Sequence, residues 1–65
     1  MNIQKIKEQI AEIEDSDSES AHAEEDMLYT KFVEHVSLYP NDPDLREMAL
    51  EVLKTKSMDF DRWYA

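Results

Sequence analysis

The 65-residue chain contains no glycine, and its only two prolines, Pro40 and Pro43, stand close together in one segment. A protein built from several β-strands needs many turns, and glycine and proline are the residues that most often form them. We therefore expect an all-α fold with one enforced break near the two prolines. The chain also lacks cysteine, so its thin core has no disulfide or thiolate metal site to support it.

Apolar residues recur at helical spacing in three segments. The first is predicted to be a helix over residues 2–14, with one apolar stripe formed by Ile3, Ile6, Ile10 and Ile13. The second is predicted to end near Leu38, and either Ser16 or Ser20 serves as its N-cap. Its apolar residues are Met27, Leu28, Tyr29, Phe32, Val33 and Val36.

The third helix is predicted to begin at the two prolines and to run to about Lys56. Asp42 is suited to be its N-cap and Pro43 its first residue. Proline has no backbone N–H, but the first N–H groups of a helix have no partner within the helix, so none is lost there. Its predicted core residues are Leu45, Met48, Ala49, Val52 and Leu53. The fold expected is a small bundle of three helices plus a short C-terminal helical turn.

The predicted organisation has three parts: an amphipathic isoleucine-stripe helix over residues 1–14, an acidic serine-rich linker and cap over 15–20, and a helical domain over 21–65. The isoleucine stripe either completes the bundle within one chain or seals a homodimer. The linker permits both arrangements, so the sequence leaves them open.

Sixteen acidic and seven basic residues give a net charge of −9. Six acids without a base fall within residues 15–26, and they form a candidate interaction surface: Asp15, Asp17, Glu19, Glu24, Glu25 and Asp26. Phosphate contacts need clustered Lys and Arg, so direct nucleic-acid binding is not expected. A basic protein surface is the natural partner. The alternatives are a solubilising linker or an acidic mimic of nucleic acid.

Neither a membrane role nor catalysis is expected. No apolar stretch approaches the roughly 20 residues that span a bilayer, and the N-terminus does not resemble a signal peptide. His22, Glu25 and Asp26 are spaced for one helix face, but His35 is too far along that helix to join them. We therefore predict no metal and no cofactor. So short a chain has little room for an active-site pocket, which argues against an enzyme.

The C-terminal segment concentrates aromatic side chains beside an arginine. Phe60, Arg62, Trp63 and Tyr64 are anchors either of the core or of an interface, since Trp, Tyr and Arg dominate binding hot spots. We favour the core, because a small domain needs its largest apolar side chains inside.

Three short patterns, read together, resemble a group of small uncharacterised helical proteins encoded by bacteriophages and prophages. They are Ala21-His22-x-x-Glu25-Asp26-x-Leu28, Ala49-Leu50-x-x-Leu53-Lys54-Thr55 and Asp59-Phe60-x-Arg62-Trp63-Tyr64-Ala65. The resemblance covers residues 21–65 and implies the cytoplasm of a bacterial host, without implying an activity. We therefore expect a non-catalytic accessory protein that binds a host or phage protein. The alternatives are an acidic nucleic-acid mimic and a structural homo-oligomer formed through the isoleucine helix.

Overall fold

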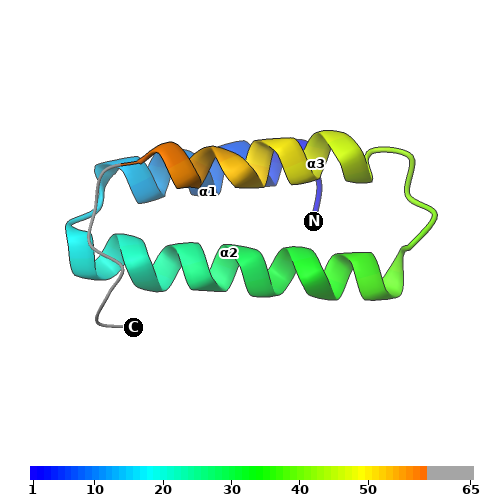
Figure 1. Ribbon diagram of the computed structural model, residues 1–65, viewed down its shortest axis with the longest axis horizontal. Coiled ribbons are helices and arrows are strands. Elements are labelled where there is room, and N and C mark those ends of the chain that lie inside the picture. Colours follow the sequence, from blue (N-terminus) through cyan, green and yellow to red (C-terminus); the bar gives the residue numbers. More distant parts are fainter. Residues whose placement is uncertain (59–65) are drawn as a thin grey trace.

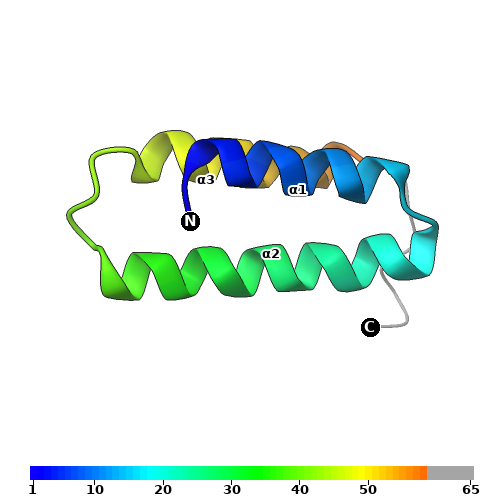
Figure 2. The ribbon, with the colours of Figure 1, turned by 180° about the vertical axis from the view of Figure 1, so that it is seen from behind.

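The computed structural model describes residues 1–58 and consists of helices joined by short turns. The elements are α1 (Ile3–Asp15), α2 (Ser18–Leu38), α3 (Leu45–Val52) and a 3-10 helix, η1 (Leu53–Ser57). The helices α1 and α3 lie side by side against α2, which is the longest (Figures 1 and 2). No strand occurs in the described part of the chain, which confirms the all-α prediction. The predicted C-terminal helical turn and its anchors Phe60, Arg62, Trp63 and Tyr64 lie outside the described residues.

The isoleucine helix is an integral part of the bundle. Asn2 caps α1, because its side chain accepts a hydrogen bond from the backbone N–H of Lys5 at 2.9 Å. Ile6, Ile10 and Ile13 are buried within the single chain, and Ile3 packs against them while remaining partly exposed. The stripe therefore completes the intramolecular core. A dimer formed through the same stripe would require α1 to leave the bundle.

The predicted linker is only a two-residue connection, Ser16 and Asp17, between α1 and α2. The N-cap of α2 is Asp17, whose carboxylate accepts from the backbone N–H of Ser20 at 2.9 Å. Ser16 and Ser20 were therefore wrong as predicted caps. Ser16 instead closes α1, and its hydroxyl lies 2.7 Å from a carboxylate oxygen of Glu24 on α2. The turn is thus fixed by its own side chains, and α2 begins at Ser18, inside the predicted linker.

The turn between α2 and α3 is held by Asp42, although α3 begins later than the sequence predicts. The Asp42 carboxylate accepts from the backbone N–H of Asp44 at 2.9 Å, as a helix cap would. The first residue with regular α-helical structure is nevertheless Leu45, and the side chain of Asp44 makes no capping hydrogen bond. Pro43 thus lies in the turn that leads into the helix.

Among residues 1–58, seven hydrophobic side chains are buried and form the core: Ile6, Ile10, Ile13, Ala21, Leu28, Met48 and Val52. Leu53 was wrongly predicted as a core residue, since it is 53% exposed. Its helix tightens to 3-10 geometry at that point, which turns each residue further around the axis. Thr55 takes the core position instead. Met27 and Val33 also prove to be exposed, on the outer side of α2.

One side-chain hydrogen bond joins α2 to the C-terminal part of the described chain. The hydroxyls of Tyr29 and Thr55 lie 2.8 Å apart, and the Thr55 hydroxyl also lies 3.3 Å from the carbonyl oxygen of Val52. Since Thr55 donates to that carbonyl, Tyr29 donates to Thr55. Thr55 thus brings a hydroxyl to a completely buried position, and the hydrogen bonds to Tyr29 and Val52 satisfy that hydroxyl.

Candidate functional site

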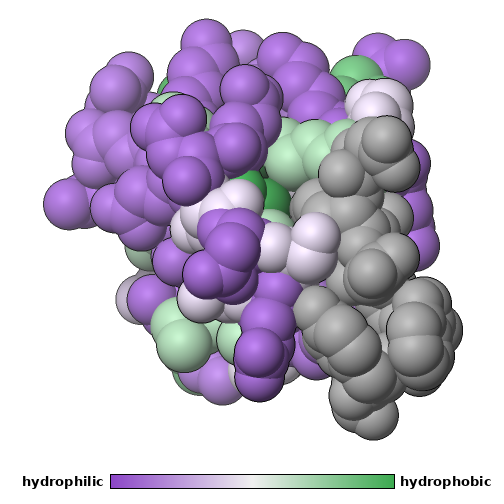
Figure 3. All heavy atoms as spheres, turned by 90° about the vertical axis from the view of Figure 1, so that its left-hand side faces the viewer, coloured by the Kyte–Doolittle hydropathy of each residue, from purple (hydrophilic) through white to green (hydrophobic). Residues whose placement is uncertain are grey.

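The turn between α1 and α2 carries an exposed cluster of carboxylates. Five acids there are exposed, and we call them the acidic turn: Glu12, Glu14, Asp15, Asp17 and Glu19. No ion pair with any of them is formed within residues 1–58. Figure 3 looks toward this end of the bundle, where hydrophilic residues cover most of the described surface. The cluster therefore presents negative charge to solvent without compensation.

Two members of the acidic turn oppose the stability of their own helix. Glu14 and Asp15 lie in the last turn of α1, and that turn contains no basic residue. A helix C-terminus carries partial negative charge, so acids placed there are unfavourable. Asp17, in contrast, caps α2, and Glu19 lies in its first turn, where a carboxylate is favoured. Within residues 1–58, helix capping and the helix dipole therefore account for Asp17 and Glu19 but not for Glu14 and Asp15.

The structure separates the six acids that the sequence grouped as an interaction surface. Asp15, Asp17, Glu19 and Asp26 are exposed. Glu24 is partly buried against Ser16, and Glu25 is buried, with 3% of its surface exposed. Glu12 and Glu14, which the sequence grouping left out, join the exposed set. The charged surface thus centres on the turn itself and includes the end of α1.

The cluster of His22, Glu25 and Asp26, which was predicted not to hold a metal, contains one long contact between His22 and Asp26. The ring Nε2 of His22 lies 3.6 Å from a carboxylate oxygen of Asp26, while Glu25 faces the core. Among the residues that the structure describes, no group of three potential ligands could hold a metal ion. His35 lies near the far end of α2 with a different partner.

That partner is Asp42, and the pair ties the α2–α3 turn to α2. The Nε2 atom of His35 lies 2.8 Å from the Asp42 carboxylate, and the ring lies 5.0 Å from that of Tyr39. Because a carboxylate only accepts, Nε2 carries the hydrogen. The backbone N–H of Asp44 and then the His35 ring donate to this carboxylate and hold the pKa of Asp42 below its ordinary value.

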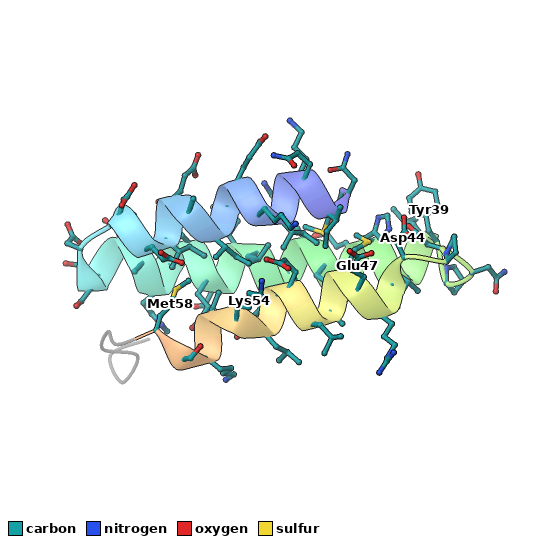
Figure 4. All side chains as sticks on the ribbon, turned by 90° about the horizontal axis from the view of Figure 1, so that it is seen from above. Tyr39, Asp44, Glu47, Lys54 and Met58 are labelled. Atoms are coloured by element: carbon teal, nitrogen blue, oxygen red, sulfur yellow. The ribbon has the colours of Figure 1, made fainter. Side chains whose placement is uncertain are left out.

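Two adjoining hollows lie beside this pair, and His35 lines both of them. One, of about 550 Å³, is a groove between α1 and α2, and the other, of about 660 Å³, lies against the α2–α3 turn. Met1, His35, Leu38 and Tyr39 line both. Leu38 is 70% exposed and Tyr39 is 58% exposed. Figure 4 places Tyr39 at the end of the bundle that lies opposite Met58. Large apolar side chains therefore stand in solvent beside a concave surface.

The histidine–aspartate pair resembles the base and orienting partner of a catalytic site, but no hydroxyl or thiol nucleophile lies beside it among residues 1–58. Within that part of the chain, neither hollow is lined by a serine, threonine or cysteine. The nearby hydroxyl of Ser37 donates to the backbone carbonyl of Glu34 at 2.7 Å. Nucleophilic catalysis needs a nucleophile within hydrogen-bonding distance of the base. The arrangement suits a structural role for the pair, namely anchoring the turn.

Sequence reasoning missed this end of the bundle. It predicted that the second helix ends near Leu38 and that Tyr39 belongs to the segment that terminates it, but it assigned neither residue to a surface. The available signal was their position: two large apolar residues immediately precede a proline turn, where α2 has no later turn to cover them. The hollow beside them also needs Met1 and the start of α1, which only the folded chain brings together.

The chain matches no protein-family model, no curated protein and no solved structure. None of the helices in residues 1–58 combines the length and apolarity that a membrane crossing requires. The resemblance to phage-encoded proteins stays a prediction. The features of the molecule that bear on its function are the acidic turn and the two hollows.

Proposed function

We propose that this protein is a non-catalytic accessory protein that binds a positively charged protein partner through the acidic turn. The observation that carries the proposal is the position of Glu14 and Asp15. Both are exposed at a helix C-terminus, where they cost stability and have no ion-pair partner within residues 1–58. Residues that weaken their own fold are expected where they serve an interaction.

The overall charge supports the same proposal. A net charge of −9 on 65 residues attracts a basic partner over a long range and speeds its association. The setting that we propose, from the resemblance to phage-encoded proteins, is the cytoplasm of a bacterial host. The partner is then a host or phage protein.

A second candidate function uses the same surface. Six exposed carboxylates between Glu12 and Asp26, with no base among them, favour an acidic mimic that occupies a nucleic-acid-binding site. Because Glu25 is buried, fewer carboxylates are exposed than the sequence contains in this segment, and we therefore rank mimicry second. A homo-oligomer formed through the isoleucine helix is the least supported function, because its stripe is occupied within the chain.

The test is affinity capture with the tagged protein from bacterial lysate, with parallel washes at low and at high salt. A third sample receives excess duplex DNA during capture. Exposed charges are screened beyond about 8–10 Å at ordinary ionic strength, so binding through the acidic turn must weaken as salt rises.

The three samples separate the candidates. A partner lost at high salt but retained with DNA supports the proposed function. A partner lost in both conditions supports nucleic-acid mimicry, because DNA then competes for the same site. A partner that remains bound at high salt contradicts both, and recovery of the bait alone favours self-association.

A further inference from the structure

The groove between α1 and α2 presents charges of both signs that do not pair with each other. Lys5, Glu8 and Glu12 line its α1 wall, and Lys31 and Glu34 line its α2 wall. No ion pair joins the two walls among the described residues, and Glu8 receives only a long hydrogen bond of 3.4 Å from the Gln4 side chain. The groove thus offers both carboxylates and ammonium groups to a ligand.

Apolar side chains stand at one end of this groove, and one residue of the acidic turn, Glu12, lines the other end. Leu38, Tyr39 and Met1 lie at the end near the α2–α3 turn, with Leu38 70% exposed. On α2, Lys31, Glu34 and Leu38 follow one another at spacings of about one helical turn, and all three line the groove. The groove therefore continues the surface assigned to the partner.

We propose that this groove binds one amphipathic, basic helix of the partner, in the manner of a fourth helix added to the bundle. Its apolar residues lie against Leu38 and Tyr39, and its Lys or Arg residues face Glu12 and the acidic turn. From Met1 to Glu12 the α1 wall spans about 17 Å, which corresponds to roughly three helical turns. The inference rests on the proposed function, because it names the chemistry of the partner segment at that site.

Charge decides against a second copy of this chain as the occupant. Two copies would each carry a net charge of −9, and each would bring its own acids to the contact. A basic helix relieves the uncompensated negative charge and covers the exposed apolar side chains at once. Amphipathic helices that lie in a surface groove and are anchored there by apolar side chains are a recurrent form of peptide recognition.

The probe is a synthetic 14-residue helix-forming peptide of about equal leucine and lysine content, with leucines spaced on one face. A second peptide has the same composition in scrambled order, without an apolar face. Affinities come from isothermal titration, and amide NMR shifts of the labelled full-length chain locate the site. Two variants accompany the parent: Leu38→Asp in the groove and Leu50→Asp on α3, where Leu50 is 56% exposed and is not one of the lining residues.

We expect the amphipathic peptide to shift amides of residues 1–12 and 31–39 and to bind at least tenfold more tightly than the scrambled one. Leu38→Asp should weaken binding at least tenfold, and Leu50→Asp should leave it unchanged. Equal binding of the two peptides would overturn the groove proposal while leaving charge-based capture by the acidic turn intact. Absence of binding, or equal losses in the two variants, would also overturn it. So would a dimer in sedimentation that Leu38→Asp converts to a monomer.

Discussion

Neutralising the two acids at the end of α1 should stabilise the protein, which is the sharpest consequence of their position. The change is the double substitution Glu14→Gln and Asp15→Asn. It alters neither side-chain shape nor helix propensity greatly, so it reports mainly on charge. Both residues are exposed in the last helical turn, where an acid costs about 0.3–1 kcal/mol at low salt.

Together the two substitutions should add roughly 1 kcal/mol to the free energy of unfolding, or about 4–8 °C in Tm for a domain of this size. The matched control is Asp44→Asn with Glu47→Gln, which also removes two negative charges, but at the N-terminus of α3. Acids are favourable there, so the control should lower Tm by a similar amount. Equal changes in net charge should thus give opposite changes in stability.

The assay is thermal unfolding followed by circular dichroism at low salt, repeated at high salt. Salt screens both effects, so the three curves should converge as ionic strength rises. A fall in Tm for the Glu14/Asp15 variant would refute the reasoning, because it would mean that these carboxylates stabilise the fold. A rise of equal size in both variants would instead attribute the effect to net charge and not to position.

Three further predictions concern the core and the turns. Ile6→Val should lower the free energy of unfolding in urea by about 1 kcal/mol, independently of protein concentration, because Ile6 is completely buried within one chain. The control Val33→Ala, at a 66% exposed position, should lower it less. A transition that depends on protein concentration would contradict the intramolecular core. Tyr29→Phe and Thr55→Val should each cost about 0.5–1.5 kcal/mol and should show a coupling energy in a double-mutant cycle, whereas strict additivity would mean that their hydroxyls do not interact. Hydrogen bonds keep the pKa of Asp42 below the ordinary 3.8, so the ionised carboxylate stabilises the fold fully above pH 3.8, and this stabilisation is lost as the pH falls through the lower pKa of the folded state. The Tm of Asp42→Asn should therefore fall less than that of the parent between about pH 4 and pH 2. Equal falls in Tm would contradict the role of the Asp42 carboxylate.

The periodicity of apolar residues predicted much of the fold, because residues three or four positions apart lie on the same face of a helix, and that face is buried when they are apolar. Ile6, Ile10, Met48 and Val52 are buried as expected. The pattern failed at Leu53, where 3-10 geometry replaces the α-helical period, and nothing in the residues around it signals that change. It also could not show that Met27 and Val33 lie on the outer side of α2, since a helix of 21 residues offers more apolar positions than its neighbours cover.

Polar residues in the core were the least predictable part. His35 and Glu25 lie on the buried face of α2, in line with Leu28, yet their chemistry suggested exposed positions. His35 is buried because Asp42, from the following turn, supplies a hydrogen-bond partner. Such pairs depend on how the chain folds back, which the sequence does not state. The acidic surface was predicted from composition, but the set of exposed carboxylates depended on how α2 turns about its axis.

The central claim is that the acidic turn, and not negative charge in general, binds the partner. The most direct test compares the amount of partner captured from lysate by three proteins under identical low-salt conditions. They are the parent, the Glu14→Gln/Asp15→Asn variant and the Asp44→Asn/Glu47→Gln variant, of which the last two have the same net charge. We predict that only the Glu14/Asp15 variant loses the partner. Equal capture by the two variants would contradict the claim, because it would leave overall charge, or another surface, as the source of binding.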